Sequence, residues 1–213
     1  MAAGGPAGRL LARVDADLAR AFRDRDAAVL AFSGGLASLI VAALARKHGD
    51  LRCAVVGTPN AADAIAALVA RDFLDYPVDL LPPSVPEVLR ATRAIGSSNP
   101  RLTVAEALSI VPLALVEARC ADRLVLSGFG LAPRSPAVGR HLLGMAVLSP
   151  GLRRTAAPPR SLLLRAAREL ALPDGFALAS RRIPAEGSGI GPALRAAGHA
   201  RHVSVGRLVG RVV

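Results

Sequence analysis

The residues best suited to chemistry form a short run near the N-terminus, residues 33–38 with the sequence SGGLAS. An apolar segment, residues 27–32, precedes this run, and an alanine-rich apolar segment follows it. This order predicts a buried strand, a glycine turn and a helix. Such a turn directs several backbone N–H groups and a helix N-terminus at one point, which suits a phosphate or pyrophosphate group.

Strand and helix patterns alternate around this run. The predicted strands are continuous apolar segments, as expected when both faces of a sheet are buried. Strands are predicted over residues 27–32, 51–56, 76–81 and 123–126, and helices over 9–22, 36–48, 62–73, 86–95, 104–120 and 161–170. We expect Gly49 to cap the helix over 36–48, Ser161 to cap the last helix, and residues 96–100 to form a turn. The pattern predicts an α/β fold with a parallel sheet between two layers of helices.

Glycine-bearing turns follow three of the predicted strands, at residues 33–35, at Gly57 and at residues 127–130. The carboxyl ends of parallel strands meet at one edge of a sheet, where ligands bind. We therefore expect the three turns to line one crevice. Prolines interrupt the chain after Leu131, so we expect residues 1–132 to form the α/β core. Residues 133–213 would form a helical C-terminal extension that completes the same domain.

The composition fits one domain with a core of small side chains. Of the 213 residues, 52% are apolar and only 3% are aromatic. The net charge of +11 comes almost wholly from arginine, with Lys47 as the only lysine. This charge fits an anionic partner such as a nucleotide, pyrophosphate or RNA, but arginines spread along the chain also fit a bias in coding. Cys53 and Cys120 have no metal-ligand spacing, and we expect buried, reduced thiols.

A membrane span is the alternative interpretation of the uncharged segment from residue 27 to residue 45. The glycine turn interrupts that segment near its middle, and Asp26 and Arg46 bound it tightly without aromatic anchors. The N-terminus also lacks the apolar core of a signal peptide. We therefore predict a cytoplasmic protein without a membrane partner.

Four motifs, in order along the chain, resemble the C-terminal domain of asparagine synthetase, a PP-loop ATP-pyrophosphatase. Residues 33–38 resemble its SGGLDS pyrophosphate loop, and residues 123–133 resemble its strand followed by GEGADE. Residues 162–173 resemble its LR-to-LP helix, and residues 181–190 (RRIPAEGSGI) resemble the basic segment that ends compact archaeal members. The resemblance covers most of the chain and implies the adenine-nucleotide α-hydrolase-like fold, a three-layer sandwich.

The resemblance also implies a ligand and a reaction. In that family the loop binds the pyrophosphate of ATP, an aspartate carboxylate is adenylated, and ammonia then displaces AMP. We expect ammonia to come from solution or from a separate glutaminase, because these residues include no counterpart of the family's glutaminase domain. The family's nucleotide-binding positions correspond here to Ser33, Gly34, Gly35, Ser38, Val56, Gly57, Ser127 and Gly128, and its phosphate-contacting cation corresponds to Arg182.

The acidic residues of the family's motifs are replaced in this chain. The loop Asp is Ala37, and the GEGADE carboxylates are Phe129, Ala132 and Pro133. A hard cation such as Mg²⁺ prefers carboxylate oxygens, so the sequence predicts ATP as the ligand but offers no evident magnesium site. Asp63 and Asp122 are the carboxylates that could substitute.

These replacements leave several interpretations open. The chain could be an amide-forming ligase of the asparagine synthase type or a nucleotide-binding subunit without turnover. An RNA-directed PP-loop enzyme is a third alternative, but we do not expect a nucleic-acid partner because both cysteines lie in apolar stretches. Each motif also has a structural interpretation, in which Gly34 makes a tight turn, Ser38 caps a helix and Arg182 is solvated.

Overall fold

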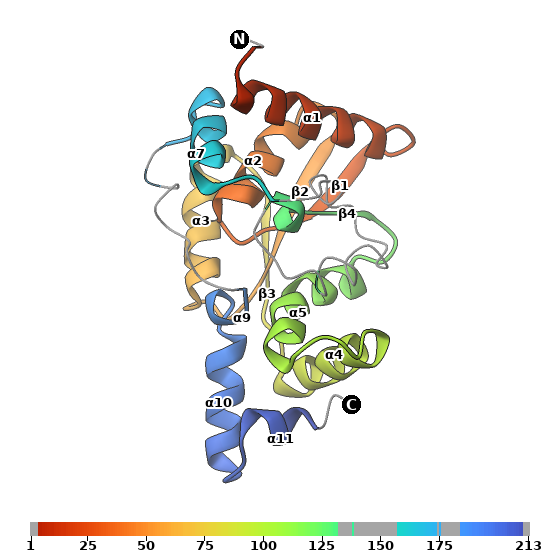
Figure 1. Cartoon of the computed structure of the whole chain (residues 1–213), viewed down its shortest axis with the longest axis vertical. Helices are drawn as coiled ribbons and strands as arrows, with labels where there is room; N and C mark the ends of the chain where they lie inside the picture. The colour runs from red at the N-terminus through yellow and green to blue at the C-terminus, as the bar shows by residue number, and fades with distance from the viewer. Residues whose placement is uncertain (1–3, 132–137, 139–156, 174, 176–183, 211–213) are drawn as a thin grey trace.

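A parallel four-stranded sheet forms the centre of the molecule (Figure 1). The structure is a computed structural model that describes residues 4–131, 138, 157–173, 175 and 184–210. The strands are β1 (Ala27–Ala31), β2 (Asp50–Val56), β3 (Val78–Leu81) and β4 (Leu124–Ser127), in the order β3-β2-β1-β4. All neighbouring strands pair in parallel. Their carboxyl ends therefore lie at one edge, and the predicted fold class is confirmed.

Helices cover both faces of this sheet, because alternate residues of each strand enter different cores. On β1, Leu30 packs with α1, α2 and α7, whereas Val29 packs on the opposite face with α4 and α5. The helices are α1 (Pro6–Ala21), α2 (Leu36–Ala45), α3 (Ala62–Leu74), α4 (Val85–Ser98), α5 (Val104–Arg119), the 3-10 helix η1 (Gly128–Leu131), α7 (Arg160–Glu169), α9 (Pro184–Gly187), α10 (Ile190–Ala200) and α11 (Val205–Val209). Among the described residues, no helix is long and apolar enough to cross a bilayer.

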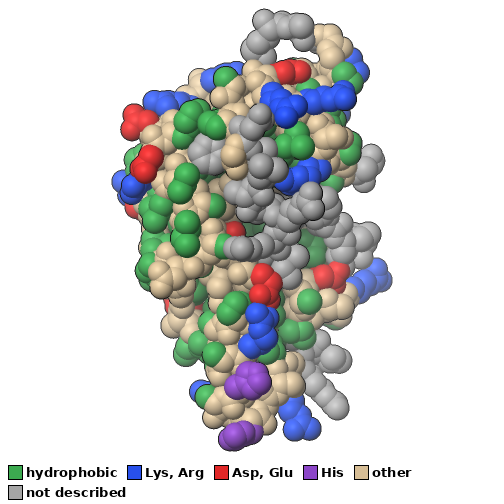
Figure 2. All heavy atoms as spheres, turned by 90° about the vertical axis from the view of Figure 1, so that its left-hand side faces the viewer, with side chains coloured by type: hydrophobic (Ala, Val, Ile, Leu, Met, Phe, Trp, Pro, Cys, Tyr) green, Lys and Arg blue, Asp and Glu red, His purple; other side chains and the backbone are tan. Residues whose placement is uncertain are grey.

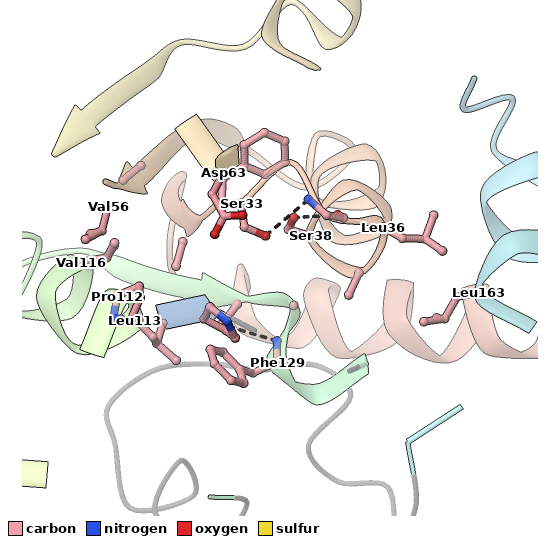
Figure 3. A pocket seen from close by; sticks show the side chains of 18 of the residues that line it. Ser33, Leu36, Ser38, Val56, Asp63, Pro112, Leu113, Val116, Phe129 and Leu163 are labelled. Atoms are coloured by element: carbon pink, nitrogen blue, oxygen red, sulfur yellow. Dashed lines mark hydrogen bonds between the residues drawn. The ribbon is translucent and has the colours of Figure 1, made fainter. Parts of the chain in front are cut away.

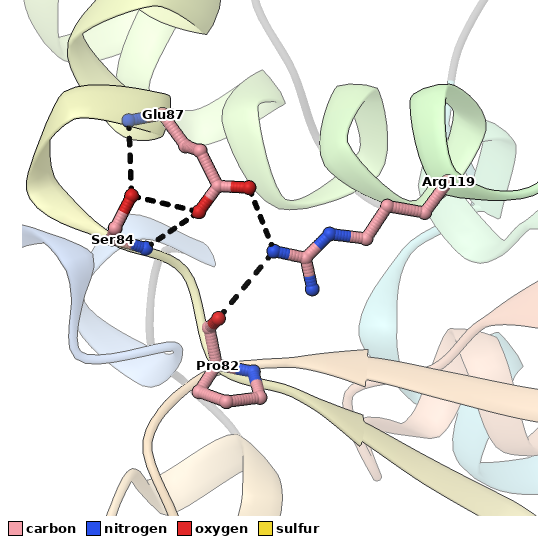
Figure 4. A network of polar contacts seen from close by, with 4 residues as sticks. All are labelled: Pro82, Ser84, Glu87 and Arg119. Carbon is pink, nitrogen blue, oxygen red and sulfur yellow. Dashed lines mark hydrogen bonds and ion pairs between the residues drawn. The ribbon is translucent and has the colours of Figure 1, made fainter.

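A polar network fixes the start of α4 to the end of α5 (Figure 4). The Glu87 N–H donates to Ser84 Oγ at 3.3 Å, and the Ser84 N–H donates to Glu87 Oε2 at 2.8 Å, which completes a capping box. Arg119 donates to Glu87 Oε1 at 3.0 Å and to the Pro82 carbonyl at 3.4 Å. The bonds from Ser84, and then the one from Arg119, lower the pKa of Glu87 to about 2.

Three local expectations from the sequence are wrong. Helix α2 ends at Ala45 rather than His48, and Gly49 is outside the left-handed region. Gly49 serves close packing instead, because a Cβ there would lie 2.6 Å from the Asp26 carbonyl oxygen. Helix α7 begins at Arg160 with Pro159 as its N-cap, so Ser161 caps nothing. Helix α4 continues to Ser98, so the turn expected over residues 96–100 starts later than predicted.

The two cysteines differ in environment. Cys53 is fully buried on β2, and burial raises the pKa of its thiol to about 12. Cys120 is only half-buried at the end of α5, which the expectation of two buried thiols did not anticipate. Both are free thiols. The high pKa makes Cys53 a poor nucleophile at neutral pH.

Helix α3 presents a row of apolar side chains to solvent. Ile65, Val69 and Phe73 are 52%, 56% and 50% exposed and lie four residues apart on one side of the helix. Figure 2 views the side of the molecule on which α3 lies and shows hydrophobic side chains along it. The rest of α3 packs inward through small residues, because Ala64, Ala67 and Ala70 are fully buried.

Candidate functional site

The glycine turn after β1 has the backbone geometry of an anion-binding loop. Gly34 lies in the left-handed region with φ of 67°, which other residues rarely adopt. Gly35 is extended and forms the N-cap of α2. The Gly35 N–H donates to Ser33 Oγ at 3.3 Å, and the Ser38 hydroxyl donates to the Gly35 carbonyl at 2.8 Å. Ser38 therefore fastens the loop to the first turn of α2 rather than capping its N–H groups.

The turn after β4 lies directly against this loop. A Cβ at Gly128 would lie 2.7 Å from the Ser38 nitrogen and 2.9 Å from the Ala37 carbonyl carbon, so only glycine allows this approach. The Phe129 N–H donates to Ser127 Oγ at 3.1 Å, which holds the turn in shape. The contact follows from the topology, since β1 and β4 are neighbours and Ala31 pairs with Ser127.

A cavity of about 470 Å³ opens beside these two turns. Such a volume lies in the range of small-molecule sites. Figure 3 shows the side chains that line it. Six of the residues expected to bind nucleotide are among them, namely Ser33, Gly35, Ser38, Val56, Ser127 and Gly128. The structure thus brings the ends of β1, β2 and β4 to one cavity.

The remaining expected residues lie elsewhere. Gly34 does not line the cavity. It faces α3 instead, where a Cβ would lie 2.6 Å from the Ala66 carbonyl carbon. Gly57 faces the C-terminal segment, where a Cβ would lie 2.9 Å from the Ser188 carbonyl oxygen. Arg182 lies outside the described residues. Pro184, two residues further along the chain, lines the cavity.

The turn between α9 and α10 packs against the loop between β2 and α3. Gly187 contacts the Asp63 carboxylate so closely that a Cβ would overlap it. Gly189 adopts the left-handed conformation with φ of 78° at the start of α10. Arg195 donates to both oxygens of Glu186, at 2.7 and 2.8 Å, and this contact lowers the pKa of Glu186. The C-terminal segment therefore closes the Asp63 side of the cavity.

Sequence reasoning missed the walls that the long helices contribute. Helix α5 supplies Pro112, Leu113 and Val116, and the α7 region supplies Pro158, Arg160 and Leu163. Pro112 could have been noticed in the sequence, because a proline inside a predicted helix is unusual. It leaves one backbone carbonyl of the helix without its usual N–H donor. The α7 residues carried none, since their pattern is that of an ordinary amphipathic helix.

Asp63 is the only carboxylate among the described residues that line the cavity. Its side chain is buried in the first turn of α3, close to Ser33 in Figure 3. Asp122, the other carboxylate considered, is exposed ahead of β4, at the opposite edge of the sheet. Within the described parts of the chain, no three metal-binding side chains gather. These donors do not rebuild the acidic set of the asparagine synthetase motifs, so we assign no magnesium to the site.

No family model and no curated protein matches the chain. Its structure is similar to NMN synthetase from Francisella tularensis, with a TM-score of 0.57, 14% identity, and coverage of 96% of this chain and 85% of that one. It is also similar to the NH3-dependent NAD synthetase from Campylobacter jejuni, solved with a nitrate ion. There the TM-score is 0.54, the identity 15%, and the coverage 93% and 86%.

This likeness establishes the adenine-nucleotide α-hydrolase-like fold, which the motif resemblance implied. At such low identity it establishes the fold alone. The asparagine synthase activity implied by the motifs stays a prediction.

Proposed function

We propose that this chain binds an adenine nucleotide, ATP, with its phosphates at the loop of residues 33–38. One observation carries the proposal: the first turn of α2, the Gly34 turn and Gly128 meet at one wall of the cavity. Gly35 has no side chain to satisfy the first N–H groups of α2, which leaves these donors for a phosphate. The fold shared with an NMN synthetase and an NAD synthetase supports the same ligand class.

The nucleoside would occupy the part of the cavity between β2 and α5. Val56 and Val116 are apolar walls that suit a purine ring, and Ser127 offers a hydroxyl beside the phosphate loop. The backbone of Gly128 would add polar contacts without a side chain, whereas Gly57 faces Ser188 and would act only through the packing of this loop. In the same assignment, Arg182 would meet the phosphates from the segment that leads to Pro184.

We further propose that the bound nucleotide is not turned over. Ala37 and Phe129, which line the cavity beside the loop, replace the carboxylates of the resembling motifs. Without them, the described lining offers no acidic pair to hold a cation against the phosphates. A nucleotide-binding subunit or sensor fits these residues better than a ligase.

An amide-forming ligase is the second candidate, and the buried carboxylate of Asp63 in the cavity favours it. In that reaction a substrate carboxylate oxygen attacks the α-phosphorus of ATP, and the bond to the departing pyrophosphate breaks. Ammonia then attacks the acyl carbon, AMP leaves, and the nitrogen loses a proton to water. The substrate would be an aspartate-type acid, and ammonia would come from solution or a separate glutaminase.

Isothermal titration with ATP, AMP and pyrophosphate, first in EDTA and then with Mg²⁺, tests the binding proposal. We expect ATP to bind in EDTA and pyrophosphate to compete with it. Ala37→Asp adds a carboxylate facing the phosphates, so it should weaken ATP binding in EDTA about tenfold, and Mg²⁺ should restore it. Ala37→Asn, which has the same shape without the charge, is the control. If ATP gives no heat and pyrophosphate does not compete, the nucleotide site is wrong.

Pyrophosphate release separates the two candidates. The wild-type protein with ATP, Mg²⁺, aspartate and ammonia should release no pyrophosphate above the background without protein. Release that depends on both the acid and the protein would establish the ligase instead.

A further inference from the structure

The net charge of the chain arises almost entirely in its C-terminal part. Residues 132–213 hold 13 of the 27 lysine and arginine residues but only three of the 16 acidic residues, so ten of the eleven net positive charges arise there. A coding bias towards arginine explains a high arginine content, but it does not explain why acidic residues are scarce in this part. Such an imbalance is typical of a surface that meets an anionic partner.

Two arginines of α4 join this charge where α4 packs against the C-terminal helices. Helix α4 contacts both α10 and α11 at the end of the molecule where the chain ends (Figure 1). Arg93 Nε donates to the Val209 carbonyl of α11 at 2.7 Å, and Arg90 lies one turn earlier on the same side of α4. Arg207 lies two residues before Val209, and Arg201 lies in the turn between α10 and α11. We call Arg90, Arg93, Arg201 and Arg207 the basic end.

The four arginines of the basic end are exposed. None of them forms an ion pair with any residue that the structure describes, and the carbonyl that Arg93 binds carries no charge. Glu87 is the only acidic residue of α4, α10 and α11, and Ser84 and Arg119 already hold its carboxylate. On the face in Figure 2, the end formed by α10 and α11 shows basic side chains and histidines but no Asp or Glu.

The side chains around the basic end favour one kind of anionic partner. A protein that binds a membrane surface usually inserts apolar side chains, and the large apolar side chains exposed in the described residues lie on α3 instead. Stacking on the bases of a single strand needs aromatic side chains, and α4, α10 and α11 contain no Phe, Tyr or Trp. Arginines alone suit the phosphates of a duplex, which are contacted without reading the bases.

We propose that the basic end binds the phosphate backbone of a double-stranded nucleic acid without sequence preference. Each guanidinium group donates hydrogen bonds to phosphate oxygens. The proposal does not depend on the nucleotide site, because none of the four arginines lines the cavity. The positions of the two cysteines, on which the expectation of no nucleic-acid partner rested, do not affect this surface.

Fluorescence anisotropy with a labelled RNA hairpin and a labelled DNA duplex of the same sequence tests the proposal. We expect the affinity to fall about a hundredfold between about 50 and 200 mM salt, because four neutralised phosphates release their counterions. Binding of the RNA, the DNA or both supports the proposal and identifies the source of the backbone. If neither duplex binds at about 50 mM salt, the proposal is wrong. Binding to phosphatidylserine vesicles in that case would assign the surface to a membrane.

Variants localise the binding to the basic end. The triple variant Arg90→Gln, Arg201→Gln, Arg207→Gln keeps Arg93, which connects α4 to α11. At about 100 mM salt its affinity for the duplex should fall at least about tenfold, and the slope of the salt dependence should decrease by about three. The single variant Arg207→Gln should decrease that slope by about one, and it serves if the triple variant does not fold. An unchanged affinity and slope in a folded variant would overturn the proposal.

A matched control removes the same charge from the opposite end of the molecule (Figure 1). Arg13, Arg23 and Arg25 are exposed on α1 and in the turn after it. The triple variant Arg13→Gln, Arg23→Gln, Arg25→Gln should change the affinity by less than about threefold, because salt screens charges that lie far from the bound duplex. Thermal melting of all variants checks that they are folded. Equal weakening by the two triple variants would mean that the total charge binds the duplex rather than the basic end, and the proposal would be wrong.

Discussion

The starts of α4 and α5 differ from those of α2, α3 and α7, which begin at the cavity. Helices α4 and α5 start with complete capping boxes, Ser84 with Glu87 and Thr103 with Glu106. Helices α2, α3 and α7, which start at the cavity, have Gly35, Ala61 and Pro159 at the N-cap. None of these three residues has a side-chain oxygen that could accept a hydrogen bond.

Capped helix starts contribute to the stability of the fold, whereas an uncapped start leaves N–H donors that a ligand can use. An N-cap side chain typically adds about 1 kcal/mol to stability by satisfying a first-turn N–H group. The chain makes that contribution at α4 and α5, whose first turns do not line the cavity. At α2 no side chain caps the corresponding N–H groups, and the proposed function assigns these donors to a phosphate. The comparison predicts that changes at the loop disturb backbone conformation, while changes at the capped helices cost the energy of a cap.

The largest effect is expected from Gly34→Ala. The added Cβ forces a left-handed conformation on alanine and meets the backbone of Ala66 at 2.6 Å. Together these should lower the free energy of unfolding by about 3 kcal/mol. Urea denaturation measures the change. Gly206→Ala, in α11, would meet only Ser204 Oγ at 4.0 Å, so it should leave the free energy of unfolding unchanged or raise it by up to about 1 kcal/mol.

An equal loss in the two glycine variants would contradict the comparison. It would mean that the loop accepts a Cβ and that the wall of the cavity is not fixed by Gly34.

A smaller effect is expected from Ser84→Ala. The variant removes the hydroxyl that accepts from the Glu87 N–H, and it should lower the free energy of unfolding by about 1 kcal/mol. Ser97→Ala, at an exposed position inside the same helix, is the matched control and should cost no more than about 0.5 kcal/mol. ATP affinity should be the same in both variants, since α4 begins away from the cavity. A drop in ATP affinity confined to Ser84→Ala would show that the two regions are coupled.

The sequence predicted the sheet and the loop well because both depend on local patterns. Apolar runs ended by glycine define β1, β2 and β4, and a parallel sheet gathers their carboxyl ends. The cavity walls from α5 and α7 were not predictable in this way. Leu113 and Leu163 look like core residues, and only the packing of distant helices shows that they also face a cavity. The prediction that Gly49 caps α2 was wrong for a related reason. The close contact between Gly49 and Asp26 is a tertiary contact, which a local pattern does not show.

The smallest effect concerns acid stability and tests the capped region alone. The pKa of Glu87 is about 2 in the folded protein, below its ordinary value of 4.5, because Ser84 and then Arg119 donate hydrogen bonds to the carboxylate. Stability from this group is therefore complete above about pH 4.5 and is lost as the pH falls toward 2. Water screens the partly exposed pair, so the effect is modest.

Urea denaturation of Glu87→Gln at pH 6 and pH 3 measures that contribution. Glutamine keeps an acceptor but takes up no proton, so the variant should lose less stability than the wild type between these two pH values. Glu169→Gln, which removes an exposed carboxylate at the end of α7, should retain more of the wild-type pH dependence. If Glu87→Gln and the wild type lose the same stability, the carboxylate does not hold the start of α4. The capping box would then act through Ser84 alone, and the contrast between capped and uncapped helices would rest on a hydroxyl rather than on charge.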